Sequence, residues 1–207
     1  MATTAGGIPA EKAQLRAQIR AQRAAVAPAE LVATAAAIAG IAEPIIAAQP
    51  PGARVACYLS GPTEPGTDAL VLALLNHGLE VITPRVRAGQ LDWAVVNGTS
   101  ELTTGPFGIR EVIGPSVGID AEPLQQACLI FVPALAIDRR GVRLGQGGGY
   151  FDRTLALLND VGTNRPARIG VVNEVEFLDA LPEEPHDCRV DLAISGHHLH
   201  QIRSNAS

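Results

Sequence analysis

The residues best suited to chemistry lie in one glycine-rich segment, residues 143–152, which begins with Arg143 and ends with Asp152. Glycine lacks a Cβ, so several backbone N–H groups can converge on an anion without obstruction. The segment leads into a predicted helix, and helix N-termini attract negative charge. Arg143 adds a cation, and Asp152 could hold a metal ion. Together these features suit phosphate groups with Mg²⁺.

The segment does not match the common nucleotide-binding motifs. A Walker loop requires a lysine followed by Ser or Thr, and this segment has no lysine. The dinucleotide fingerprint requires a glycine where this chain has Tyr150. On the residues alone, phosphate binding and a turn needed only for packing are equally good interpretations. In the second, Asp152 would only stabilise the start of the helix through the helix dipole.

A second group of charged residues lies near the N-terminus, on a helix predicted over residues 9–25 from its periodicity. At about 100° per residue, its basic side chains fall within roughly 80° of the helix circumference. They are Lys12, which is the only lysine in the chain, and Arg16, Arg20 and Arg23. Exposed basic arcs are usually solvated faces, and we expect this for Arg20 and Arg23.

The order of predicted elements indicates an α/β fold, a layered sandwich with a central, mostly parallel sheet flanked by helices. Further helices are predicted over residues 28–48, 68–77 and 150–160. Strands are predicted over residues 54–60, 80–84, 91–96, 129–137, 167–172 and 190–195, the last being the final strand. Residues 97–127 are expected to be mainly loop. Ligands bind beyond the carboxyl ends of such strands, and the glycine-rich segment follows the strand at 129–137.

Composition favours a single domain spanning residues 1–207, with flexible tails at 1–8 and 197–207. Hydrophobic residues make up 47% of the chain, and the net charge of -5 argues against a nucleic-acid partner. No uninterrupted apolar stretch reaches the ~18 residues of a membrane span, and no signal peptide is recognisable. Three widely spaced cysteines without a C-x-x-C motif indicate a reduced, cytoplasmic protein. We expect a monomer.

Three histidines near the C-terminus, His197, His198 and His200, could form a metal site. They lack a fourth ligand in register. Because chain ends are usually mobile, we expect them to lie in a flexible tail.

Residues 132–138, followed by Gly141 and the run Arg-Leu-Gly-Gln-Gly-Gly-Gly-Tyr-Phe-Asp-Arg from Arg143, closely resemble the signature of the 5-formyltetrahydrofolate cyclo-ligase family, also called methenyltetrahydrofolate synthetases. Shorter stretches agree in the same order. They are Lys12-x-x-Leu15-Arg16, Glu64-x-x-Thr67, Phe107-Gly108-Ile109 with Glu111, and Leu181-Pro182-x-Glu184-x-His186-Asp187. The resemblance extends from about residue 11 to residue 195.

This resemblance implies an α/β fold, ATP as co-substrate, Mg²⁺ as cofactor and a reduced folate as substrate. Lys12, Arg143 and Tyr150 would take part in catalysis. ATP would meet Lys12, Arg16, Arg143, Leu144, Gly145, Gln146, Gly147, Gly148, Gly149, Tyr150 and Asp152. The folate would meet Glu64, Phe107, Gly148, Tyr150 and Phe151. Asp152 and Asp187 would hold the Mg²⁺.

The implied reaction is a cyclisation. The N5-formyl oxygen attacks the γ-phosphate of ATP, N10 then attacks the formyl carbon, and phosphate leaves to give 5,10-methenyltetrahydrofolate. Such a reaction requires mainly positioning and neutralisation of phosphate charge, which suits cations and backbone N–H groups.

Three residues depart from the family pattern. Val112 stands where proline is usual, Glu176 where glutamine is usual, and Phe151 where a second tyrosine is common. Phenylalanine keeps the ring but loses a hydroxyl. Trp93 and Phe107 could belong to the core or could stack on the folate.

Two alternative functions stay open at this point. One is an ATP-independent α/β protein, such as a sugar-phosphate isomerase or a CoA-transferase-like protein, because one fold serves many functions. The other is a non-catalytic regulator that binds folate or nucleotide. Consumption of ATP distinguishes the first alternative from the cyclo-ligase, and turnover distinguishes the second.

Overall fold

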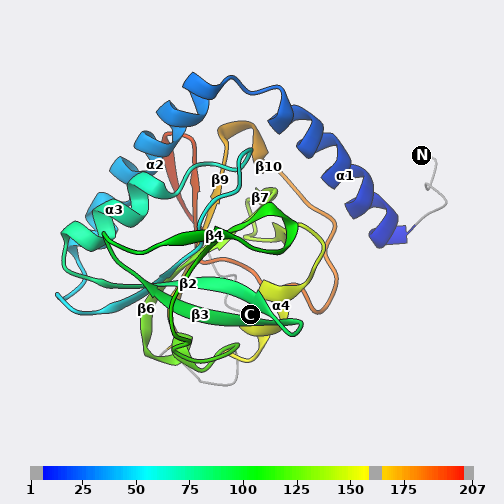
Figure 1. Ribbon diagram of the computed structural model, residues 1–207. Helices are drawn as coiled ribbons and strands as arrows, with labels where there is room; N and C mark the ends of the chain where they lie inside the picture. Colours follow the sequence, from blue (N-terminus) through cyan, green and yellow to red (C-terminus); the bar gives the residue numbers. More distant parts are fainter. Residues whose placement is uncertain (1–6, 159–164, 203–207) are drawn as a thin grey trace.

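A seven-stranded sheet forms the centre of the computed structural model, which describes residues 7–158 and 165–202, except for the side chain of Phe107 (Figure 1). The strand order is β12-β11-β9-β6-β1-β2-β3. The strands are β1 (Arg54–Cys57), β2 (Glu80–Arg87), β3 (Gln90–Val96), β6 (Ala127–Pro133), β9 (Ala167–Val172), β11 (Leu192–Ser195) and β12 (His198–Gln201). The strands from β11 to β2 run parallel, and the two edge strands are antiparallel. The predicted α/β sandwich is confirmed.

Alternating side chains of the parallel strands are buried on both faces of the sheet, as expected for strands with helices on both sides. On one face, Val55 and Phe131 pack with α2 (Pro28–Ala47) and α3 (Asp68–Asn76). On the opposite face, Ile82 and Ile130 pack with Leu155 of α4 (Tyr150–Ala156) and with Trp93. Trp93 is 1% exposed, so it belongs to the core.

Helix α1 (Gly7–Ala24) diverges from α2 at a sharp bend and lies on the side of the molecule that holds β7 and β10 (Figure 1). It places Leu15 and Ile19 against a small apolar cluster. At its C-terminal end, Arg23 is 2% exposed and donates from Nε and Nη2 to the two carboxylate oxygens of Glu176, each at 2.7 Å. The expectation of a solvated Arg23 was therefore wrong, because the buried partner lies 153 residues away in sequence.

The apolar run at 129–137 was predicted as one strand, and this was wrong. Strand β6 ends at Pro133, and β7 (Ala136–Asp138) belongs to a separate sheet with the order β10-β7-β8. Its other strands are β8 (Arg143–Leu144) and β10 (Phe177–Leu178). The N–H of Leu135 donates to the carbonyl of Leu144 at 2.7 Å, so the chain bends toward the glycine-rich segment. Uniform apolarity does not reveal such a change of sheet.

The region at 97–127, expected to be mainly loop, contains a small antiparallel pair, β4 (Leu102–Thr104) and β5 (Arg110–Val112). Short 3₁₀ helices occur at η1 (Pro106–Gly108), η2 (Pro123–Gln126) and η4 (Glu174–Glu176).

The expected flexible tails need correction at both ends. Helix α1 begins at Gly7, and β12 pairs with β11 through His198–Gln201. His200 stacks on Phe177 with ring centroids 3.8 Å apart and lies 2.7 Å from the Ser195 hydroxyl, which fixes this end of the chain. The last strand among the described residues is therefore β12. Residues 1–6 and 203–207 lie outside the described residues.

Among the described residues, one helix, α2, is long and apolar enough to cross a membrane by length and composition alone. Core helices of soluble proteins and signal sequences meet the same criterion, so this is a weak indication. Helix α2 also buries Ile38, Ala42 and Ile46 in the core. The expected lack of a membrane span stays a prediction.

We predict that Arg23→Leu lowers the free energy of unfolding by about 3–5 kcal/mol, because the carboxylate of Glu176 would stay buried without its cationic partner. Urea unfolding followed by circular dichroism measures this change. Arg139→Leu is the control, since the Arg139–Asp179 pair is exposed and should contribute less than about 1 kcal/mol. Equal losses in the two variants would contradict the prediction.

Candidate active site

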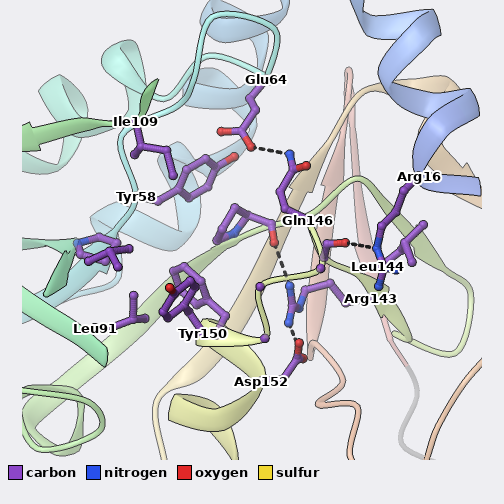
Figure 2. A pocket seen from close by; sticks show the side chains of 18 of the residues that line it. Arg16, Tyr58, Glu64, Leu91, Ile109, Arg143, Leu144, Gln146, Tyr150 and Asp152 are labelled. Carbon is purple, nitrogen blue, oxygen red and sulfur yellow. Dashed lines mark hydrogen bonds and ion pairs between the residues drawn. The ribbon is translucent and has the colours of Figure 1, made fainter. Parts of the chain in front are cut away.

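One pocket collects the charged and glycine-rich residues beyond the carboxyl ends of β1 and β6 (Figure 2). Tyr58 and Leu59 follow β1, and Pro133 ends β6. The pocket also includes side chains from α1 and from residues 184–187. It therefore brings together segments that are distant in sequence at the edge of the sheet where the parallel topology predicts a ligand site.

The glycine-rich segment forms one wall of this pocket. Gly147 and Gly149 have positive φ values of 103° and 68°, which favour glycine over residues with a Cβ. Arg16 fixes the segment from α1, because its Nε donates to the carbonyl of Gly145 at 2.9 Å. Leu144 and Gly148 also line the pocket.

Arg143 lies buried at the base of the segment, where it connects the sheet to α4. Its Nη1 donates to the carbonyl of Pro133 at 3.1 Å, and its Nη2 donates to the carboxylate of Asp152. Arg143 is 4% exposed. Asp152, predicted as a metal ligand, is therefore paired with an arginine of the same segment, and a bound cation would have to share or replace that partner.

Lys12 extends from α1 into the same pocket and is 5% exposed. Its Nζ lies 2.5 Å from Oδ2 of Asp187 and 2.9 Å from Oε2 of Glu184. Burial by itself would lower the pKa of Lys12, but the hydrogen bonds to Asp187 and Glu184 outweigh burial and raise the pKa above 10.5. The lysine is therefore fully charged near neutral pH.

Asp187 is the carboxylate that interacts most closely with Lys12. Burial by itself would raise the pKa of Asp187, but the backbone N–H of Glu184 and the ammonium of Lys12 outweigh it and hold the pKa below 3.8. A charged carboxylate and a charged lysine thus share one half-buried site.

Glu184, His186 and Asp187 form the group most suited to a metal ion among the described residues. One ligand atom of each lies within 4.8 Å of the others. Carboxylate oxygens suit Mg²⁺, which keeps several waters when bound. Asp152 is not part of this group, although it lines the same pocket. Glu184 was not predicted as a site residue, although it occurs in the stretch that carries the family resemblance.

The other side of the pocket is more apolar and holds the predicted folate contacts. Glu64 lies on a loop after β1, and its Oε2 accepts from the N–H of Gly61 at 2.9 Å. Phe151 lies edge-on to Trp93 with ring centroids 6.4 Å apart, and Tyr150 lines the cavity. The side chain of Phe107 lies outside the described residues, so its predicted contact stays a prediction.

Tyr58 lines the same side of the pocket and was missed from sequence. Burial and the nearby carboxylate of Glu64 raise the pKa of Tyr58 well above its ordinary value, so the hydroxyl stays neutral. In the sequence, Tyr58 fell inside the strand predicted over residues 54–60, so it was not marked as a site residue. Ile109 stands beside it, as Figure 2 shows.

The three residues that depart from the family pattern take no part in the ion pairs of Lys12 and Arg143. Val112 is 2% exposed and belongs to the core. Glu176 accepts hydrogen bonds from both Arg23 and Asn173. The ring of Phe151 is retained at the pocket wall.

The fold and the pocket define an α/β protein with a charged ligand site at the carboxyl ends of its parallel strands. The sequence profile described as the 5-formyltetrahydrofolate cyclo-ligase family matches residues 8–196. The chain belongs to this family.

Individual relatives agree with this assignment. The 5-formyltetrahydrofolate cyclo-ligase of Mycolicibacterium smegmatis is 40% identical over 142 residues, which cover 66% of this chain and 70% of the relative. That of Escherichia coli K12 is 31% identical over 137 residues, which cover 64% and 72%.

Two solved structures are similar to most of the chain. The 5,10-methenyltetrahydrofolate synthetase of Aquifex aeolicus superposes with a TM-score of 0.76 at 25% identity and 95% coverage of both chains. The synthetase of Mycoplasma pneumoniae has a TM-score of 0.67 at 21% identity, covering 89% of this chain and 98% of that chain, and supports the fold.

We predict that the stabilising contribution of the Lys12–Asp187 pair depends on pH at both extremes. The ordinary pKa of aspartate is 3.8, and folding lowers the pKa of Asp187. The contribution is therefore fully present above pH 3.8 and is lost as the pH falls through the lower pKa of the folded state. The ordinary pKa of lysine is 10.5, and folding raises the pKa of Lys12. The contribution is therefore fully present below pH 10.5 and is lost as the pH rises through the higher pKa of the folded state.

A double-mutant cycle with Lys12→Met and Asp187→Asn, measured by urea unfolding without metal, tests this prediction. The coupling energy should be smaller at about pH 3 than at about pH 7. The exposed Arg139–Asp179 pair is the control and should show little coupling at either pH. A coupling energy that is unchanged in acid would contradict the prediction.

Proposed function

We propose that the protein catalyses the ATP-dependent cyclisation of 5-formyltetrahydrofolate to 5,10-methenyltetrahydrofolate, with release of ADP and phosphate. Family membership supports this reaction. The observation that carries the proposal is the division of one pocket into two sides. Figure 2 shows Arg16 and Arg143 with the glycine-rich segment on one side, and Glu64 with the rings of Tyr58 and Tyr150 on the other.

In the proposed reaction, an electron pair of the formyl oxygen forms a bond to the γ-phosphorus while the bond to the β–γ bridging oxygen breaks and ADP leaves. N10 then attacks the formyl carbon and closes the ring. The C–O bond breaks, phosphate leaves, and the N10 proton is lost. The protein must align the formyl oxygen with the phosphorus and neutralise the charge on the phosphate oxygens.

Each cation of the pocket has a role in this scheme. Arg143, buried at the base of the glycine-rich segment, would neutralise the charge of the phosphate oxygens. Arg16 would act beside it from α1, and Lys12 would turn from Asp187 and Glu184 toward the γ-phosphate. Tyr150, which lines the pocket, would orient the formyl group.

Mg²⁺ is the cofactor that the donor set of this pocket fits, since carboxylates lie beside the proposed phosphate site. Asp187 and Asp152 would hold it, and we add Glu184 because it lies with Asp187 in one potential ligand group. When bound, Mg²⁺ supplies positive charge to the phosphate oxygens.

We further propose a cytoplasmic, monomeric, single-domain enzyme that acts on small molecules and has no nucleic-acid or membrane partner. The net charge of -5 supports the lack of a nucleic-acid partner. Family membership disfavours the isomerase and CoA-transferase alternatives. Turnover would exclude the non-catalytic regulator.

We expect purified protein, mixed with 5-formyltetrahydrofolate, ATP and Mg²⁺, to form the methenyl product, which is followed by its absorbance, with one ADP released per product. Leaving out ATP should abolish product formation, and removing Mg²⁺ with a chelator should strongly reduce it. Product formed without ATP, or no product with all components, would contradict the proposed function.

We expect Lys12→Ala and Arg143→Ala each to lower kcat/KM for ATP by about 10- to 100-fold, because each removes a charged contact to phosphate. Steady-state kinetics with varied ATP at saturating folate measures this effect. Arg139→Ala is a matched control, since Arg139 is an exposed arginine paired with Asp179. If ATP kinetics were unchanged in both site variants, the proposed phosphate contacts would be wrong.

A further inference from the structure

Gln146 lies where the phosphate side and the folate side of the pocket meet (Figure 2). Its Nε2 donates to Oε1 of Glu64 at 3.1 Å. The other oxygen of Glu64 accepts from the N–H of Gly61. The carboxylate of Glu64, which is expected to bind the folate, therefore already accepts a hydrogen bond from a side chain of the glycine-rich segment.

Arg20 determines which end of the Gln146 side chain faces Glu64. Its Nε and Nη2 lie 3.2 and 3.0 Å from Oε1 of Gln146, and Nη2 donates to the carbonyl of Gln146 at 2.8 Å. A guanidinium group can only donate hydrogen bonds, so it holds the amide oxygen. The amide nitrogen is left facing the carboxylate of Glu64.

We propose that Gln146, oriented by Arg20, couples folate binding to the conformation of the phosphate-binding segment. A pterin ring presents N–H donors that compete with Nε2 of Gln146 for the Glu64 carboxylate. Folate binding therefore separates Gln146 from Glu64 and removes one connection between the loop that carries Glu64 and residues 145–147. This coupling rests on the proposed function, because it requires that the folate reaches Glu64.

The rest of the segment does not depend on this connection. Arg16 holds the carbonyl of Gly145 from α1, and Arg143 bonds to Pro133 and Asp152. Changes at Gln146 or Arg20 are therefore expected to alter the coupling while the wall of the pocket keeps its position. By linkage, a nucleotide that moves Gln146 away from Glu64 would strengthen folate binding by the same factor.

Gln146→Leu keeps a side chain of similar size but removes the competing amide. Its dissociation constant for 5-formyltetrahydrofolate, measured by calorimetry without nucleotide, should be about two- to fivefold lower than that of the wild type, as expected for loss of one competing hydrogen bond. Arg20→Ala should shift it in the same direction by a smaller factor. Arg139→Ala, which removes an exposed arginine paired with Asp179, should not shift it.

Hydrogen–deuterium exchange provides a second readout that a purely structural role would not change. Adding 5-formyltetrahydrofolate alone should increase amide exchange of residues 145–147 by about twofold or more in the wild type. It should have no such effect in Gln146→Leu, where the connection is already absent.

These outcomes separate the coupling from the proposed function. A wild type that binds the folate with the same affinity and the same exchange response as Gln146→Leu would overturn the coupling alone, as would weaker folate binding by Gln146→Leu. A wild type that does not bind 5-formyltetrahydrofolate would contradict the proposed function and the coupling together.

Discussion

Pairing of opposite charges is the constraint on which the structure of the pocket depends. A buried charge is destabilising unless a partner of opposite sign lies in contact with it. Lys12 is paired with Asp187 and Glu184, and Arg143 is paired with Asp152. The pair of Lys12 also holds the N-terminal part of α1 against residues 184–187, while Arg23 and Glu176 hold its C-terminal end. These contacts therefore help to assemble the pocket and also attach the helix that carries Lys12 and Arg16.

This arrangement explains why α1 can be attached by few apolar contacts. Ile19 and Leu15 pack against one small cluster, and the remaining described contacts of the helix include hydrogen bonds from Arg16 and Arg20 to the glycine-rich segment. A helix held in this way is positioned by the same groups that a phosphate ligand would contact. Its precise position is therefore expected to respond to ligand binding more than the position of α2, which is packed on the central sheet.

The sequence predicted the class of fold and most elements because local patterns determine them. The strands β1, β2, β3 and β9 and the helices α2 and α3 follow from periodicity and from Gly and Pro boundaries. The bend between β6 and β7 did not follow, because both halves are apolar and the distinction lies in their partners, β9 and β8. Strand β12 was missed for a related reason, since polar residues near a chain end become ordered only through β11.

Candidate site residues were predicted mainly through family resemblance. Most of them line one pocket, and their roles stay predictions. Lys12, Asp187 and the glycine-rich segment come together although they are distant in sequence. Physical reasoning on single residues was less successful, because it treated Arg23 as solvated and gave Glu184 no role. In both cases the deciding information is a long-range ion pair, which no local pattern in the sequence reveals.

The charge balance of the pocket also bears on how a nucleotide would enter. Lys12 and Arg143 already have carboxylate partners, so the pocket is not a simple basic site for a polyanion. Free ATP would have to displace Asp187 and Asp152 from their cations and would leave those carboxylates charged and half-buried. Asp187 and Asp152 would keep a cationic partner if they held a divalent cation, and the phosphates could then meet Lys12 and Arg143. Such an exchange would leave fewer charges unpaired than binding of free ATP, and it would therefore favour entry of ATP together with Mg²⁺.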